Sequence, residues 1–372
     1  MDTTRSGTIA APLAGAASTV LAGVRREILR YRVALAICAL HAVLVIGLLA
    51  WNGRTVPLVL GEYVIVALMP PVFIAVVTLI GEAAHQALHV RPFRLRAIPA
   101  ALGKGLLAPS RLAQVAVPVV VLPLFATLFT AFKTAIPAFV PFHLDEAFMR
   151  LDRWLHFGHH PWEILQPVLG HPAVTMVVSH LYNMWFLIMY LIVYWQLFAM
   201  RDQALRLRYL VAFLLAWTVL GNGLAVLLSS AGPIYYGDVV GGADPYAPLV
   251  AYLDRLHADF GLLAREAQLY LWTVYQGGEA AAGGGISAMP SLHVAVATIQ
   301  ALWGWRVDRR LGIALTAYAV VIQIGSIHLG WHYAVDGYVS VLCALGIWWL
   351  AGRLVGDRPG TRATAPSAAT AA

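Results

Sequence analysis

The sequence predicts an all-α integral membrane protein with about eight transmembrane helices, and two observations carry this prediction. Of the 372 residues, 60% are hydrophobic and only 12% are charged, whereas about 25% of the residues of an ordinary soluble domain are charged. The apolar residues gather in runs of roughly 20, which is long enough for a helix to cross a bilayer. We expect these spans at 33–50, 57–80, 113–141, 173–199, 209–231, 289–305, 311–328 and 332–352.

The basic residues indicate how these spans are oriented. Most of them lie in five blocks, at 25–32, 91–111, 201–208, 306–310 and 353–362. All five blocks fall on one side of the membrane if both termini are cytoplasmic, and arginine and lysine concentrate in cytoplasmic loops. We therefore expect cytoplasmic termini, with the loops 142–172 and 232–288 on the periplasmic or extracellular side.

The amino-acid composition also bears on the partners, the location and the ordered part of the protein. The net charge of +7 comes from the blocks between the spans, which argues against a nucleic-acid partner. An alanine-rich chain with many arginines and few lysines indicates a GC-rich bacterium, so we expect the inner membrane. Cys38 and Cys343 lie inside apolar runs and predict no disulfide framework. We expect disorder in the first 20 or so residues and in the Pro/Ala/Thr-rich tail after Asp357.

The two long outer loops differ in character. The loop 142–172 places Leu144, Phe148, Leu151 and Leu155 at helical spacing, which predicts a helix lying in the membrane interface with its charged residues on the other faces. The loop 232–288 is rich in glycine and aromatic residues and ends in three consecutive glycines. Loops of this length are usually functional, and we expect a lid with a hinge at the glycines.

Three histidines and an aspartate mark the outer ends of the last three spans: His293, His328, His332 and Asp336. Under the topology above, all four fall within about two helical turns of the outer face. Ionisable groups at the edge of a membrane cost free energy and usually mark a functional site. A single histidine could simply be solvated by lipid head groups, but three at a common depth indicate a shared site.

The spacing of these residues indicates which reaction they could catalyse. His332 and Asp336 are four residues apart at the start of a helix, so they share a face and can hydrogen-bond. A carboxylate on one ring nitrogen leaves the other free to attack phosphorus. His293 follows Pro290 in a helical first turn, whose free N–H groups, with Ser287 or Ser291, favour a phosphate. Together these residues provide the nucleophile, orienting group and proton donor for phosphoryl transfer through a covalent histidine.

The same residues carry a family resemblance. Pro290-Ser-Leu-His293 and His332-Tyr-Ala-Val-Asp336 resemble the second and third signature motifs of the type 2 phosphatidic acid phosphatase superfamily, and the nearer match is the branch with the inositol phosphorylceramide synthases. The stretches 152–158 and 229–236 are similar to that branch. The resemblance implies that His332 is the nucleophile, Asp336 its orienter and His293 the acid. It also implies a membrane lipid substrate, with neither metal nor cofactor.

The resemblance also predicts a domain organisation. The family's six-helix catalytic core corresponds to 113–352. It is preceded by a cytoplasmic segment, 1–32, and by two additional spans with a basic loop, 33–112. A disordered cytoplasmic tail, 353–372, follows the core.

Two departures from the family pattern affect phosphate binding. The usual first motif, Lys-x6-Arg-Pro, is missing: aligning its proline on Pro233 puts Gly232 and Ala225 where the cations should be. Ser326 stands where the third motif carries an arginine. Sphingolipid phosphotransferases of the superfamily also lack the usual first motif, so the departures favour transfer to an alcohol over hydrolysis.

Other polar groups must then balance the phosphate charge. The candidates lie in the outer halves of spans or beside the motifs: Ser287, Ser291, His328, Ser326, Lys133, Asn222 and Tyr235. For each candidate inside a span the alternative is an interhelical hydrogen bond or, for Lys133, a side chain that reaches to the interface. Arg150 and Arg153 in the first outer loop could serve instead, although arginines there usually contact lipid head groups.

Two rival functions remain at this point. His328, His332 and Asp336 have the i, i+4, i+8 spacing of a zinc site, but one helix over 311–352 would be about 63 Å long, so we expect a tight turn at Leu329–Trp331. A lipid transporter is the second rival, and the sequence contains neither paired basic sites nor inverted repeats that would favour it. The sequence does not predict the oligomeric state or the identity of the lipid donor. The acceptor could be ceramide, diacylglycerol, a polyol or water.

Overall fold

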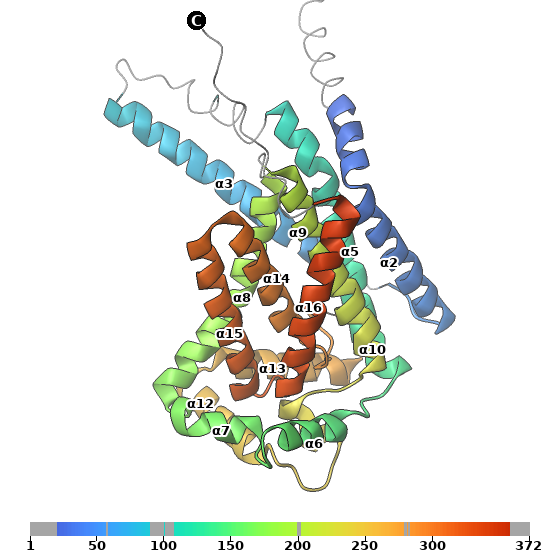
Figure 1. Cartoon of the computed structure of the whole chain (residues 1–372), viewed down its shortest axis with the longest axis vertical. Helices are drawn as coiled ribbons and strands as arrows, with labels where there is room; N and C mark the ends of the chain where they lie inside the picture. The colour runs from blue at the N-terminus through green and yellow to red at the C-terminus, as the bar shows by residue number, and fades with distance from the viewer. Residues whose placement is uncertain are drawn as a thin grey trace, which may run out of the picture. The chain divides into compact units, whose positions relative to one another are not determined.

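A computed structural model describes residues 21–56, 59–89, 100, 108–198, 202–278, 281 and 283–357. Within these ranges the regular structure is helical and contains no strand (Figure 1), so the predicted all-α class is confirmed. The first 20 residues and the tail after Asp357, which were predicted to be disordered, lie outside the described residues, whereas residues 353–357 of the predicted tail are described and include the end of α16.

Six helical segments are long and apolar enough to cross a membrane, and they coincide with six of the eight predicted spans. They are α2 (Arg32–Trp51), α5 (Pro109–Phe139), α8 (Pro172–Phe198), the continuous segment Gln203–Leu227, α15 (Arg309–His328) and α16 (Ala334–Val355). The segment Gln203–Leu227 comprises α9 (Gln203–Leu215), a π-helical stretch η1 (Ala216–Leu224) and α10 (Ala225–Leu227). The protein is therefore membrane-embedded.

The other two predicted spans fall on helices of a different length. The span 57–80 corresponds to α3 (Leu60–His89), in which Leu60–Met69 forms a short apolar stretch. The span 289–305 corresponds to α14 (Leu292–Val307), which has 16 residues. At 1.5 Å per residue α14 is about 24 Å long, less than the hydrocarbon thickness of about 30 Å, because residues 287–291 are not helical.

The chain divides into two compact units, Met1–Leu128 and Phe129–Ala372. In the first unit, the Tyr31 hydroxyl donates a hydrogen bond to the Gln114 carbonyl, and the rings of His41 and Phe125 lie 4.6 Å apart between centroids. These contacts join α2 to the first part of α5. The second unit contains every candidate site residue.

Helices α14 and α15 form the closest pair of the second unit. A Cβ atom at Gly312 would lie 2.6 Å from the Trp305 ring, and one at Gly304 would lie 2.9 Å from Leu315. Glycines let membrane helices approach closely, so the two backbones can pack against each other. Helix α16 then packs on α9 and α14, and α8 packs on α15. This packing brings the starts of α14 and α16, which carry the motif residues, into one core.

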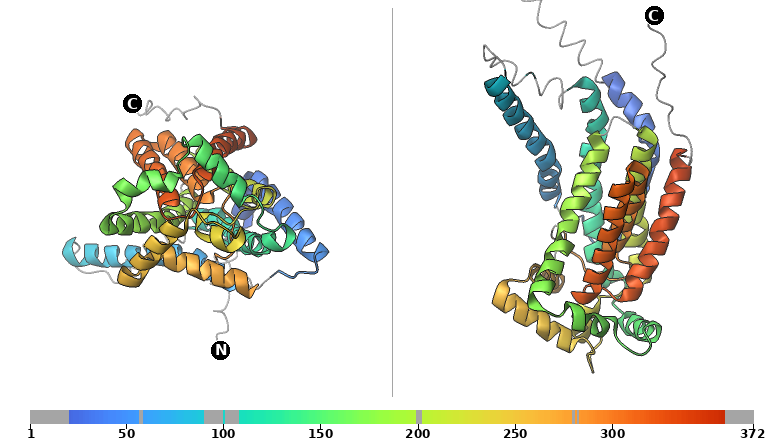
Figure 2. Two further views of the ribbon diagram at one scale, coloured as in Figure 1. Left: turned by 90° about the horizontal axis from the view of Figure 1, so that it is seen from below. Right: turned by 60° about the vertical axis from the view of Figure 1, so that its left-hand side comes forward.

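Short helices gather at one end of these long helices (Figures 1 and 2). They are α6 (Asp145–Leu155), α7 (Pro161–Leu169), η2 (Pro233–Tyr235), α11 (Tyr236–Val239), α12 (Ala247–Phe260) and α13 (Leu263–Gly277). The long outer loop that we expected to be a lid is thus largely helical. Residues 283–291, which include the end of this loop, lead into α14.

A buried ion-pair network occupies the opposite end of this unit. Asp357 accepts hydrogen bonds from Arg306 at 3.1 and 3.2 Å and from Arg208 at 3.0 Å, and the Arg208 guanidinium lies over the Trp348 ring. The network ties together α9, α14 and the end of α16. It lies at the far end of α16 from Asp336, about 30 Å away along the helix.

Cysteine labelling tests the predicted orientation. In a variant that lacks Cys38 and Cys343, we expect Ala243→Cys, in the exposed loop before α12, to react with an impermeant thiol reagent in intact cells. Arg309→Cys, at the exposed start of α15, should react only after the membrane is permeabilised. The reverse pattern would move the candidate site to the cytoplasmic side.

Candidate active site

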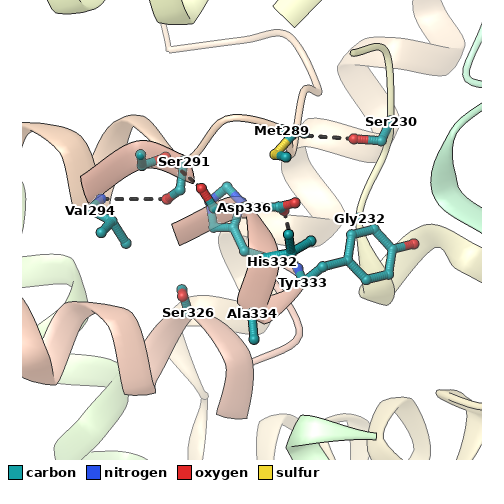
Figure 3. A network of polar contacts seen from close by, with 12 residues as sticks. Ser230, Gly232, Met289, Ser291, Val294, Ser326, His332, Tyr333, Ala334 and Asp336 are labelled. Atoms are coloured by element: carbon teal, nitrogen blue, oxygen red, sulfur yellow. Dashed lines mark hydrogen bonds and ion pairs between the residues drawn. The ribbon is translucent and has the colours of Figure 1, made fainter. Parts of the chain in front are cut away.

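His332 and Asp336 form a buried pair at the junction of α15 and α16. Nδ1 of His332 lies 3.2 Å from Oδ2 of Asp336, and the same oxygen accepts a hydrogen bond from the Tyr333 N–H at 3.1 Å. Asp336 is 0% exposed and His332 is 7% exposed. Figure 3 shows both side chains at the start of α16. The carboxylate therefore fixes the orientation of the imidazole ring.

A tight turn presents this histidine. The N–H groups of Trp331 and His332 both donate to the Ser326 carbonyl, at 2.9 and 3.1 Å, and Gly330 adopts a left-handed φ of 72°. Helix α15 ends at His328 and α16 begins at Ala334, so the turn predicted in this region is confirmed. The helical spacing required by the zinc alternative does not form, and the described residues contain no cluster of three metal-ligating side chains.

His293 faces this pair from the first turn of α14. Its ring centroid lies 6.3 Å from that of His332. Tyr182 stacks on the ring at 4.8 Å, Trp185 lies 4.3 Å away between centroids, and the Trp185 indole N–H donates to the His293 carbonyl at 3.0 Å. Helix α8 thus supplies an aromatic wall that holds His293, whose side chain keeps part of its surface accessible.

The loop 229–235 holds the two histidine segments together. The Ser230 hydroxyl accepts a hydrogen bond from the Met289 N–H (Figure 3). The Ser230 carbonyl accepts from the Ala288 N–H, and the Ile234 N–H donates to the Gly330 carbonyl. Gly232 has a φ of 100°, and a Cβ atom there would lie 2.7 Å from the Trp331 carbonyl oxygen. Only glycine permits this close approach. Gly232, which the resemblance aligns with one cation of the first motif, therefore makes a close backbone contact instead.

Helix α6 contacts the site through two buried carboxylates. Asp152 accepts hydrogen bonds from the N–H groups of Ala334 at 2.6 Å and Val335 at 2.9 Å. Asp145 accepts from the N–H groups of Ala231 and Gly232 and from the Tyr333 hydroxyl at 2.9 Å.

The helix predicted at this position is confirmed, and its apolar residues and its acids differ in burial. Leu151 and Leu155 are 37% and 39% exposed, whereas Asp145 and Asp152 are 2% and 1% exposed. The carboxylates face inward because backbone N–H groups are there to receive them.

Burial sets the electrostatics of these groups. His332 lies in the turn, outside both spanning helices, and burial lowers its pKa to about 3. The Lys133 ammonium lowers the His332 pKa further, and the Ala288 backbone raises it. The imidazole is therefore neutral near pH 7, as a nucleophile must be. Burial raises the pKa of Asp152 to about 6, against the effect of its two backbone donors.

Three of the predicted phosphate-binding residues lie beside the histidines. Ser291 is the N-cap of α14 and its hydroxyl accepts a hydrogen bond from the Val294 N–H. The Ser287 hydroxyl is buried and has no hydrogen-bond partner among the described residues. Lys133, on α5, contacts the segment before α14: a Cβ atom at Gly285 would lie 2.9 Å from Lys133 backbone and side-chain atoms.

The other predicted binding residues are engaged elsewhere. The Ser326 hydroxyl donates to the Gln323 carbonyl, His328 Nε2 lies 2.9 Å from the Thr175 hydroxyl, and the Tyr235 hydroxyl donates to the Gln268 carbonyl. Asn222 is buried in the π-helical stretch η1. Ser326 still matters to the site, because its carbonyl anchors the turn that carries His332. Direct phosphate contacts by these four residues stay predictions.

A comparison with protein families decides the class. The family model described as PAP2 superfamily matches residues 146–350, more than half of the chain. The chain belongs to the PAP2 superfamily. Searches of the curated proteins and of the solved structures found no significant match.

PAP2 membership supports a lipid phosphatase-like function. The matched residues 146–350 include His293, His332, Asp336 and Asp152. Lys133 lies outside these residues, so the family match gives no information about its role. The family match is to the superfamily as a whole, which leaves the branch and the substrate open.

Two groups of residues at this PAP2 site escaped the sequence analysis. The first is the pair Asp145 and Asp152, and the second is the aromatic wall of Tyr182 and Trp185. A signal for the first was present, since carboxylates spaced seven residues apart lie on one helical face. Tyr182 and Trp185 gave no signal, because aromatic residues are common throughout apolar spans.

Proposed function

We propose that this protein is a membrane enzyme that transfers a phospho-head group from a lipid phosphate ester to an alcohol through a covalent phosphohistidine on His332. One observation carries the proposal: a neutral, carboxylate-oriented imidazole lies with its ring centroid 6.3 Å from that of a second imidazole. The two imidazoles are close enough for both to act on one phosphate ester. Within the PAP2 superfamily, we propose that the nearest branch is the one with inositol phosphorylceramide synthases.

The proposed reaction has two balanced steps. In the first, the free ring nitrogen of His332 attacks phosphorus, the bond from phosphorus to the leaving oxygen breaks, and His293 gives that oxygen a proton. In the second, the acceptor hydroxyl oxygen attacks phosphorus, His293 takes the hydroxyl proton, and the bond between phosphorus and nitrogen breaks. Asp336 holds the tautomer and stabilises positive charge on His332 during both steps.

Transfer is favoured over hydrolysis by the dryness of the site. His332 is 7% exposed, and excluding water prevents hydrolysis of a reactive intermediate. A lipid alcohol can enter from the bilayer side, which water cannot do. Hydrolysis of phosphatidic acid or of a polyprenyl phosphate is the second candidate. We propose the inner membrane as the location, with the site at its periplasmic face.

Lys133 is the residue that we propose balances the phosphate charge. It is half-buried and has no hydrogen bond or ion pair within the described part of the chain. It contacts Gly285, two residues before Ser287, and its charge acts on His332. A lysine ammonium without a partner, next to a site that lacks the family's cations, is suited to receive a phosphate oxygen.

The second phosphate contact is proposed at the start of α14. The first N–H groups of a helix have no partner within the helix and attract anions. Here Ser291 accepts the N–H groups of Val294 and Ala295, which leaves those of Leu292 and His293, and the unpaired Ser287 hydroxyl lies in the segment before them. We therefore propose that Lys133, Ser287 and this first turn together bind the phosphate that His332 attacks.

The lysine can be tested by charge removal. We expect Lys133→Met to lower kcat/KM by about 10- to 100-fold, because a hydrogen bond to a charged group contributes about 1.5–3 kcal/mol. Lys133→Arg keeps the charge and should recover part of the activity. The measurement is the initial rate with a lipid substrate, with thermal stability as a control. Wild-type kinetics in Lys133→Met would assign phosphate binding to another group.

A lipid panel separates the candidate functions. Purified protein is incubated with a phospholipid donor alone and with ceramide, diacylglycerol or a polyol, and the products are resolved by mass spectrometry. Transfer predicts a new phospholipid that appears only with an acceptor, whereas a phosphatase releases inorganic phosphate without one. Lipid binding without any product, in wild type and His332→Ala alike, would instead indicate a transporter.

A further inference from the structure

Two carboxylates of α6 contact the backbone on both sides of the candidate nucleophile. Asp152 receives the N–H groups of Ala334 and Val335, two and three residues after His332. Asp145 receives the hydroxyl of Tyr333, the residue directly after His332, and the N–H of Gly232. The Gly232 backbone in turn packs against the Trp331 carbonyl, on the other side of His332.

The contacts of Asp152 fix the direction of α16. The first four N–H groups of a helix lack partners within the helix, and Ala334 and Val335 are the first two residues of α16. Each carboxylate oxygen of Asp152 receives one of these two N–H groups. A carboxylate at a helix N-terminus also interacts favourably with the helix dipole. Asp336 lies in the same turn, so Asp152 sets where the Asp336 carboxylate points.

The contacts of Asp145 fix the turn that precedes α16. Its Oδ1 atom accepts hydrogen bonds from Gly232 at 2.8 Å and from Tyr333 at 2.9 Å. It therefore ties the loop beneath Trp331 to the residue that follows His332. The two carboxylates accept hydrogen bonds from five donors. Three of these, on Tyr333, Ala334 and Val335, lie within three residues of His332. A fourth, the Gly232 N–H, belongs to the residue that packs against the Trp331 carbonyl.

The two acids are buried at a cost in free energy. Burying a carboxylate is costly, and burial raises the pKa of both Asp145 and Asp152. Outside, α6 exposes Trp154 at 77% and, just beyond its end, Phe157 at 96%. A helix of this size could have buried those apolar side chains and exposed its acids.

We propose that α6 is a positioning element for the phosphoryl-transfer reaction, and that Asp152 and Asp145 hold His332 and Asp336 in the geometry that attack on phosphorus requires. The inference rests on the proposed function of His332. Neither carboxylate touches substrate: Asp152 acts through the start of α16 and Asp145 through Tyr333 and the 229–235 loop.

The test compares Asp152→Ala with Asp357→Asn. Asp357 is also a buried carboxylate with several hydrogen bonds, but it lies at the far end of α16. Rates of phosphohistidine formation, kcat and KM are measured together with thermal melting in detergent. We expect Asp152→Ala to lower kcat and the rate of phosphohistidine formation by about 100-fold, as small misplacements of reacting groups do, with KM changed less than about threefold. Asp357→Asn should lower the melting temperature and leave both rates near wild type.

Conservative variants keep the test decisive if Asp152→Ala does not fold. Asp152→Asn retains one acceptor oxygen for two N–H donors, so we expect an intermediate loss of about tenfold. Asp145→Asn should behave similarly. In an Asp336→Asn background, Asp152→Asn should cause little further loss, because both changes disturb the same alignment.

The outcomes distinguish this inference from the proposed function. If wild type forms phosphohistidine and Asp152→Ala and Asp152→Asn form it at the wild-type rate, α6 does not position the nucleophile. The same holds if each Asp152 variant loses activity only in proportion to the loss of folded protein. Absence of phosphohistidine in wild type would instead overturn the proposed function.

Discussion

His332→Ala is expected to abolish turnover, with a loss of at least roughly 1,000-fold, because removal of a catalytic nucleophile leaves only binding and electrostatic effects. Asp336→Asn should lower kcat by roughly 100- to 10,000-fold, since an amide in this position favours the wrong imidazole tautomer. Initial rates of purified protein with a lipid phosphate ester measure both losses. His171→Ala, which removes an exposed histidine at the same end of the helices, is the matched control and should keep wild-type activity.

A different result would reassign these residues. If His332→Ala retained a tenth or more of wild-type turnover, the imidazole could not be the nucleophile. If Asp336→Asn were fully active, the 3.2 Å contact between the two side chains would have no role in orienting the ring.

His293→Ala is expected to cause the second largest loss, and the loss should depend on the leaving group. With a lipid ester, whose alkoxide needs a proton, we expect kcat/KM to fall by roughly 100- to 10,000-fold, the usual contribution of a general acid. With an aryl phosphate ester, whose phenolate leaves without protonation, the loss should be much smaller. The ratio of the two losses is the measurement.

His293→Gln controls for packing in this experiment. The ring of His293 lies against Tyr182 and Trp185, so truncation to alanine can disturb the wall as well as remove a proton donor. Glutamine fills more of the space but cannot serve as the acid. Equal losses on lipid and aryl substrates in both variants would contradict the assignment of His293 as proton donor.

The pairing of His332 with Asp336 could be predicted from the sequence because it is local. Residues four apart at a helix start share a face, and the structure has this contact. The approach of His293 to His332 was predicted differently, from the common depth of two helix ends. This inference succeeded because the lengths of membrane helices are constrained by the bilayer.

The contribution of α6 could not be predicted in the same way. The donors that Asp152 receives lie 182 and 183 residues away in sequence, so no local pattern records them. The apolar residues at helical spacing predicted a helix in the membrane interface, and this pattern did not show that Asp145 and Asp152 on its other face are buried. In a membrane protein, apolar periodicity does not distinguish a face toward lipid from a face toward the protein core.

Polar residues within the spans gave a similar ambiguity. His328, at the outer end of a span, was predicted to help balance the phosphate charge, and in the structure its Nε2 lies 2.9 Å from the Thr175 hydroxyl. Depth in the membrane follows from sequence position, but the direction of a side chain around its helix depends on which helices pack against it. That packing is set by long-range contacts, such as the hydrogen bond from the Tyr318 hydroxyl to the Leu181 carbonyl.

Trapping the intermediate tests the central claim most directly. A reaction with radiolabelled phospholipid is quenched within its first turnover, and the labelled residue is located by mass spectrometry. We expect an acid-labile, base-stable label on His332 of wild type and none on His332→Ala, with inhibition by orthovanadate and none by EDTA. Label that persists on His332→Ala, or full inhibition by chelator that zinc reverses, would contradict a covalent histidine mechanism.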